Sequence, residues 1–141
     1  CRQKDQVMNK QKLIPALLLI ALPLSMEAQE QVKLPSGIVI AFKAGNAAEL
    51  SKHLNATVEI LLLDKEDFYK KNVAEAILRD FFASYQAKDF VIRHQGSRND
   101  AQYAIGNLVT AKGEFRVYLL LKKTDGELLI HLIRIEPENG N

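Results

Sequence analysis

The stretch "FVIRHQGSRNDAQYAIG", Phe90 to Gly106, decides the fold because apolar and polar side chains begin to alternate there. The alternation continues toward the C-terminus and predicts four strands, at residues 90–95, 101–110, 114–122 and 128–135. The connections "QGSRND", "AKGE" and "TDGE" carry turn residues, so we expect hairpins and an antiparallel meander. "QGSRND" is predicted to be a six-residue polar loop, and Gly106 to mark a bulge or bend where the sheet curves.

Before residue 90 the apolar residues recur at helical spacing. Residues 36–54 predict one helix that Gly45 and Asn46 can break in two, since glycine costs about 1 kcal/mol in a helix interior relative to alanine. Residues 73–85 predict an amphipathic helix, with Asn72 and Glu75 spaced as a capping box at its start. Between the helices, residues 57–63 predict a buried strand, 64–67 a charged turn and 68–70 a short strand.

This order of elements predicts an α+β fold. We expect a curved antiparallel sheet of four main strands plus one or two shorter ones, packed against two helices that cover one side. The fold is expected to occupy residues 29–141 as a single domain.

The first 28 residues are interpreted as upstream residues and a signal peptide. After Met8, Lys10 and Lys12 precede an apolar run at residues 13–24, and Ala28 supplies a small residue at the cleavage position. The run is shorter than the ~20 residues that span a bilayer. A retained anchor or a buried helix is the alternative. We expect cleavage after Ala28, export to the periplasm or the medium, and no stable membrane anchor afterwards.

Removal of this leader would leave a domain with no net charge. The chain has 19 basic and 17 acidic residues, and the leader holds four of the basic and two of the acidic ones: Arg2, Lys4, Lys10, Lys12, Asp5 and Glu27. A neutral domain argues against nucleic-acid binding, which needs a clustered cationic excess. Cys1, the one cysteine, lies in the leader, so the domain would have no disulfide or thiolate chemistry.

Three segments resemble an uncharacterised family of small secreted bacterial proteins, described as a domain of unknown function. They are "GIVIAFKAGNAAELSKHL", "FYKKNVAEAILRDFF" and "FVIRHQGSRNDAQYAIGNLVTAKGEFRVYLLLKK", and the resemblance covers residues 34–136. It implies a cystatin-like fold, the group that includes nuclear transport factor 2 and ketosteroid isomerase, in which dimerisation through the sheet is common. The chain departs from the family at Lys70 and Lys71, where a small polar residue is usual. The fold hosts isomerases, dehydratases, ligand binders and adaptors, so it does not select a function.

His94 and Asp100 are the candidate general bases. Simple alternation places His94 on the same face as Phe90 and Ile92, where an imidazole beside an apolar pocket can take a proton. A strand-end histidine bonded to backbone is the alternative. For Asp100 the alternative is an aspartate that caps a turn.

Tyr103, Arg116 and Tyr118 are the candidate binding residues. Alternation places them on one sheet face, as a polar and aromatic patch suited to an anionic or carbohydrate-like ligand or to a protein partner. Leu120 adds apolar character to that face; a solvated sheet face is the alternative. The three histidines lack metal-ligand spacing, so we expect no metal and no cofactor, and His53 and His131 are expected to be satisfied, half-buried side chains.

The sequence therefore favours a non-enzymatic exported binding module. It would bind an unidentified small ligand in the cone between helices and sheet, or a protein partner or second copy on the outer sheet face. The alternative is an isomerase- or dehydratase-like enzyme with His94 or Asp100 as general base in an interior cavity. A protease-inhibitor-like role rests on fold analogy alone.

Overall fold

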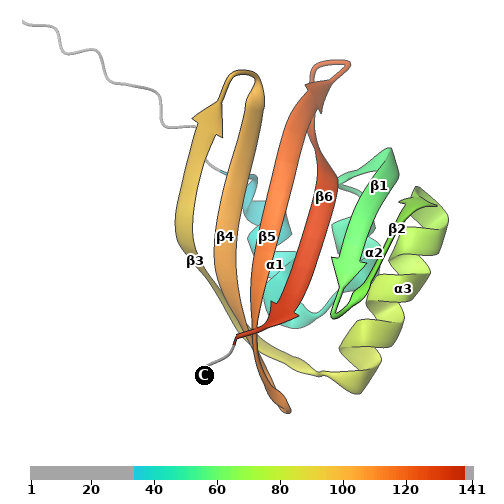
Figure 1. Cartoon of the computed structure of the whole chain (residues 1–141), viewed down its shortest axis with the longest axis vertical. Helices are drawn as coiled ribbons and strands as arrows, with labels where there is room; N and C mark the ends of the chain where they lie inside the picture. Colours follow the sequence, from blue (N-terminus) through green and yellow to red (C-terminus); the bar gives the residue numbers. More distant parts are fainter. Residues whose placement is uncertain (1–33, 139–141) are drawn as a thin grey trace, which may run out of the picture. The chain divides into compact units, whose positions relative to one another are not determined.

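The computed structural model describes residues 34–138, which form three helices and a six-stranded sheet (Figure 1). The helices are α1 (Ser36–Ala44), α2 (Ala47–Ser51) and α3 (Lys71–Ser84). The strands are β1 (Leu54–Leu62), β2 (Lys65–Lys70), β3 (Ala87–Arg98), β4 (Ala101–Thr110), β5 (Gly113–Thr124) and β6 (Glu127–Pro137). The expected leader, residues 1–28, lies outside the described part. No helix within residues 34–138 has the length and apolar character needed to cross a membrane.

The strands lie in the order β2-β1-β6-β5-β4-β3. The meander from β3 to β6 is antiparallel, as the hairpin signals predict. The pairing of β1 with β6 is parallel, so the sheet is mixed and the expectation of a purely antiparallel sheet is corrected. Turn residues reveal pairing only between consecutive strands, whereas α3 and four strands, β2 to β5, lie between β1 and β6 in the chain.

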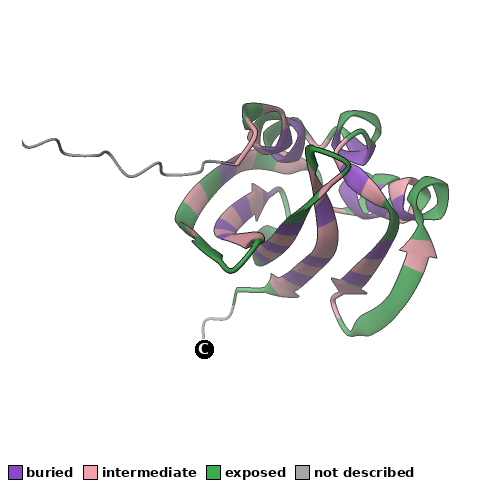
Figure 2. Ribbon diagram, turned by 90° about the horizontal axis from the view of Figure 1, so that it is seen from above, coloured by how far each residue is buried: buried purple, intermediate pink, exposed green. Residues whose placement is uncertain are grey.

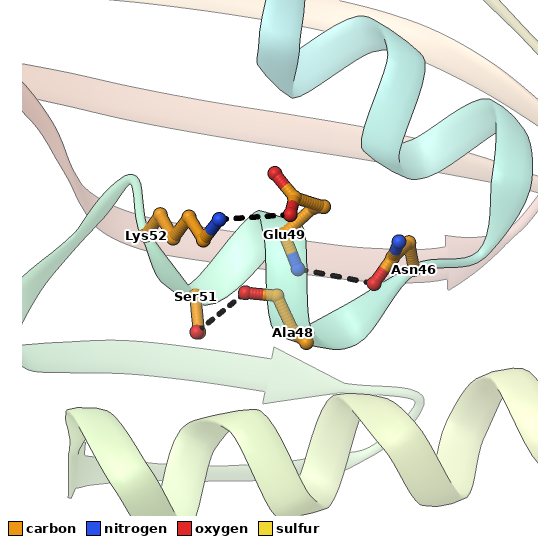
Figure 3. Close-up of polar contacts among 5 residues, drawn as sticks. All are labelled: Asn46, Ala48, Glu49, Ser51 and Lys52. Carbon is orange, nitrogen blue, oxygen red and sulfur yellow. Dashed lines mark hydrogen bonds and ion pairs between the residues drawn. The ribbon is translucent and has the colours of Figure 1, made fainter.

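The first predicted helix is two helices, because Gly45 ends α1. Gly45 has a φ of 66°, which glycine adopts without a Cβ clash, and its N–H bonds back to the carbonyls of Ala41 and Phe42. The side chain of Asn46 then accepts a hydrogen bond from the Glu49 N–H at 3.1 Å and starts α2 (Figure 3). The sheet is therefore covered by three helices instead of the two expected.

The start of α3 differs from the prediction. The helix begins at Lys71, with Lys70 as N-cap and no side-chain cap, so the predicted capping box of Asn72 and Glu75 is wrong. Asn72 already lies in the first turn, and the carboxylate of Glu75 pairs instead with Arg79 one turn later. The predicted charged turn at residues 64–67 is also shorter, because β2 begins at Lys65.

The core lies between the helices and the inner face of the sheet (Figure 2). Aromatic rings fill its centre: Phe42 stacks on Phe90 with ring centroids 4.7 Å apart, and Phe81 meets Phe115 edge to face at 5.3 Å. Phe42 and Phe90 are at most 1% exposed, and full burial of such a side chain contributes about 1.5–3 kcal/mol. The middle of the cone is thus packed with side chains.

A bulge in β3 changes which of its side chains face the core. Ile92 pairs with Gly106 and His94 pairs with Ile105, which leaves Arg93 as the extra residue. Because side chains alternate along a strand, the extra residue moves His94 to the face opposite Phe90. The expectation that His94 shares a face with Phe90 and Ile92 is therefore wrong. The predicted irregularity at Gly106 is confirmed, with the extra residue on the partner strand.

The predicted six-residue loop after residue 94 is wrong as well. β3 continues to Arg98, which pairs with Ala101, so the turn itself consists of Asn99 and Asp100. Asn99 has a φ of 61°, a left-handed conformation that asparagine tolerates. The polar composition of "QGSRND" reflects an exposed strand end and a tight turn.

Candidate functional site

The outer sheet face is the side of the sheet that points away from the helices. Cross-strand partners share a face, so strand register identifies its members. On the four central strands these are Ala101, Tyr103, Ile105, Asn107, Val109, Glu114, Arg116, Tyr118, Leu120, Lys122, Leu129, Leu132, Arg134, Glu136, Glu59 and Leu61. Its apolar members are half-buried, whereas most of the alternate residues are buried, and this gives the striped strands of Figure 2.

Two of the predicted binding residues, Tyr103 and Tyr118, lie together near the β3–β4 turn. Their rings are 6.4 Å apart and inclined by 22°, and the Arg134 guanidinium carbon lies 5.3 Å from the centroid of the Tyr118 ring. They line a surface hollow of 440 Å³, the tyrosine hollow, together with Arg98, Asn99, Asp100, Ala101, Leu120 and Lys122. Aromatic faces and two cations thus surround one concave site.

The third predicted residue, Arg116, lies in a separate hollow toward the other end of the sheet. That hollow has a volume of 510 Å³ and is lined by Arg93, His94, Ile105, Gly106, Asn107, Glu114, Arg116 and Glu138. Arg116 Nε lies 3.6 Å from Glu138 Oε1, and Asn107 donates a hydrogen bond of 3.0 Å to Glu114. Arg116 therefore pairs with the Glu138 carboxylate and does not line the tyrosine hollow.

The candidate bases His94 and Asp100 are both exposed. The bulge at Arg93 places His94 on the outer sheet face, and Asp100 lies in the tight turn at the rim of the tyrosine hollow. The expectation that one of them faces an interior cavity is therefore wrong. Within residues 34–138 no group of three His, Cys, Asp or Glu side chains is placed to hold a metal ion.

The other two histidines are half-buried, as expected. Burial lowers the pKa of the His53 imidazole, whose Nε2 would be only 2.9 Å from a Cβ on Gly37. His131 is the extra residue of a bulge in β6, and its Nε2 lies 3.2 Å from Thr124 Oγ1. Burial lowers the pKa of His131, and the nearby charge of Lys122 lowers it further.

A second concave site, the α3 hollow, lies between α3 and the strands β1 and β2. Its volume is 340 Å³, and its lining is Ile60, Leu62, Leu63, Lys65, Tyr69, Ile77, Asp80, Phe81, Ser84 and Tyr85. It opens at the side of the cone, whose centre the phenylalanines fill. The recurrence of Ile77, Phe81 and Tyr85 along α3 marks the helix side of this hollow in the sequence, but nothing local identifies the strand side.

Sequence reasoning also missed the charged residues around the tyrosines. Arg98 and Lys122 line the tyrosine hollow, and both side chains are exposed. Arg134 reaches Tyr118 from β6, and this contact follows only from the pairing of β5 with β6.

A family model described as "Domain of unknown function (DUF4783)" matches residues 35–136. A solved DUF4783 protein from Bacteroides ovatus is 36% identical, with a TM-score of 0.73 over 76% of this chain and 97% of that one. More distant structures share the fold. A domain with a cystatin-like fold from Nostoc punctiforme has a TM-score of 0.61 at 8% identity, over 74% of this chain and 73% of that one. An NTF2-like protein of unknown function from Shewanella baltica has a TM-score of 0.57 at 13% identity, over 74% and 88%.

No curated protein matches the chain. The family match covers most of the sequence, and the distant structures agree with the helix-covered curved sheet described above. The chain belongs to the DUF4783 family, and its domain has the cystatin-like, NTF2-like fold.

Proposed function

We propose that the domain is a non-enzymatic binding module whose outer sheet face docks a second copy of the chain. The face carries a continuous apolar and aromatic belt, because Tyr103 pairs with Leu120 and Leu120 with Leu132. In the adjacent row Ile105 pairs with Tyr118, and Arg134 lies between Tyr118 and Leu61. Contiguous apolar surface of this kind marks interaction sites, and Tyr and Arg are enriched in interfaces.

The observation that carries the proposal is the symmetric placement of charge around Tyr118. On β5, Lys122 follows Tyr118 by four residues and Glu114 precedes it by four, so all three share the outer face. Each charge is therefore about 14 Å from Tyr118 along the strand. Arg98 lies beside Lys122 at one end, and Glu138 lies near Glu114 at the other.

This pattern is complementary to itself. A two-fold axis through Tyr118, in the plane of the interface and perpendicular to the strands, places Lys122 opposite Glu114 of the second copy. The same axis places Glu114 opposite Lys122 of the second copy. An axis parallel to the strands would set like charges against each other, which is unfavourable. The charges thus select an arrangement in which the strands of the two copies run in opposite directions and the two Tyr118 rings meet near the axis.

Sedimentation velocity on the purified chain tests the proposal. We expect a dimer that Tyr118→Glu converts to monomer, because the substitution buries a charge at the centre of the belt. Ala76→Glu, on the exposed surface of α3, is the matched control and should remain dimeric. A wild-type chain that stays monomeric at high micromolar concentration contradicts the proposal.

The proposal also places the domain outside the cytoplasm. Its support is the leader, in which Lys10 and Lys12 precede the apolar run of residues 13–24 and Ala28 follows. Mass spectrometry of the protein from cell fractions should find the N-terminus at or near Gln29 in the exported fraction. A full-length chain confined to the cytoplasm would contradict this part of the proposal.

A further inference from the structure

We propose that the α3 hollow binds a small amphiphile, an apolar chain with a head group that carries no net charge. The site is separate from the outer sheet face, since its lining comes from α3, β1, β2 and the turn between the two strands. The inference is therefore independent of self-association.

The lining has the composition of a small-molecule site. Ile60 and Phe81 are almost fully buried and form the floor, while Leu62, Ile77 and Tyr69 are half-buried walls. Ligand sites are typically concave and mostly apolar, with volumes of about 300–1,000 Å³ and a few polar groups that fix orientation. A hollow of 340 Å³ is at the lower end of that range, which suits a single short acyl chain.

Backbone strain at Leu63 supports a role beyond packing. Leu63 lies in the turn between β1 and β2 with a φ of 61°, and its N–H donates to the Ile135 carbonyl at 2.8 Å. The other non-glycine residues with positive φ in the described chain are Asn99 and Asp125, types that tolerate this conformation. Leucine does not, and strained residues concentrate at ligand and active sites. The strain holds a leucine side chain against the hollow, where asparagine or glycine would be the unstrained choice.

The polar side chains at the rim of the α3 hollow determine the charge of the head group that can bind. It carries one ammonium at Lys65, one carboxylate at Asp80 and one hydroxyl at Ser84. No ion pair joins Lys65 or Asp80 to another residue between Leu34 and Glu138. A head group with a single net charge would meet a like charge from one of the two, whereas a zwitterionic head group can satisfy both.

Calorimetric titration with three amphiphiles of equal chain length, each below its micellar concentration, tests the inference. We expect dodecylphosphocholine to bind more tightly than laurate or dodecylamine. Asp80→Asn should raise laurate affinity about fivefold, and Lys65→Gln should do the same for dodecylamine, because each removes one like charge of about 1 kcal/mol. Equal affinity for all three amphiphiles, unchanged by either substitution, overturns the proposal.

Three further variants separate binding from folding. Ile77→Trp fills the hollow and should abolish binding, while Ala76→Trp adds the same indole on the exposed side of α3 and should not. Leu63→Asn should lower binding at least fivefold while leaving the melting temperature unchanged or higher, since it relieves the strain. Retained binding in both Ile77→Trp and Leu63→Asn contradicts the assignment of the site. Tyr118→Glu should bind dodecylphosphocholine like the wild type, so loss of dimerisation and loss of the ligand site are distinguishable.

Discussion

The ring of Phe90 lies directly against the backbone of Gly106 on the neighbouring strand. A Cβ on Gly106 would be 2.6 Å from Phe90 Cζ, closer than such atoms approach in proteins, and 3.0 Å from the Val91 carbonyl oxygen, a tight contact. The absence of a side chain at Gly106 lets Phe90 enter the core and stack on Phe42, beside the bulge that turns His94 outward.

Gly106→Ala should therefore destabilise the domain by about 1–3 kcal/mol, the usual cost of forcing an extra group into a packed core. Urea denaturation measures the change. Gly96→Ala is the comparison, because there a Cβ would first meet the Tyr103 hydroxyl at 3.0 Å, at the end of a side chain that can move. A Gly106→Ala variant as stable as Gly96→Ala would show that the Phe90 contact does not constrain the strand.

The bulge also explains where sequence reasoning failed. Alternation and turn residues were enough to predict β4 and the meander, because they are local properties of the chain. The face of His94 depends on one extra residue in β3, and nothing in "VIRHQ" indicates it. The bulge lies beside the contact of Phe90 with Gly106, a contact between residues on different strands, which a period-two pattern cannot reveal.

Asn46 provides a test of the break between α1 and α2. Asn46→Ala removes the acceptor of the Glu49 N–H and should cost about 1 kcal/mol, because a first-turn N–H loses its partner. Asn46→Ser keeps a capping oxygen and should cost less. Thermal denaturation of both variants provides the measurement, and equal destabilisation would argue against a capping role.

Stability should fall as the pH falls below about 6.5. Burial lowers the pKa of His53 and His131 in the folded state below their ordinary value of 6.5, so the unfolded chain binds more protons near that pH. The contribution of the two neutral imidazoles to the free energy of unfolding is fully present above pH 6.5. It is lost progressively as the pH falls and each histidine in the folded protein accepts a proton. Urea midpoints between about pH 7.5 and 5.5 should show the decline.

His131→Gln should reduce the slope of that decline. The pKa of the Glu59 carboxyl is raised, chiefly by its hydrogen bond with Glu66, so its contribution to stability decreases as the pH rises. The ordinary pKa of this carboxyl, 4.5, lies below the pH range of the measurement. Midpoints that do not change with pH, or an unchanged slope in His131→Gln, would contradict the account of the two imidazoles.

The candidate site was predictable from the sequence only in part, because some of its features depend on contacts between elements that are distant in the chain. Hairpin register and alternation correctly placed Tyr103, Arg116 and Tyr118 on one face, because all three lie in strands without a bulge between them. Arg116 pairs with Glu138, which follows the last strand, and the strand pattern does not predict this ion pair. The α3 hollow requires β2 to lie beside α3, and helical periodicity indicates only the helix side.

Charge reversal on β5 tests the central claim, self-association through the outer sheet face, most directly. Sedimentation velocity at low ionic strength would compare the wild type with Lys122→Glu, Glu114→Lys and the double variant. Each single reversal sets like charges against each other across the proposed two-fold axis and should weaken the dimer, and the double variant should restore it. Single reversals that leave the dimer intact, or a double variant that remains monomeric, would contradict the proposed arrangement.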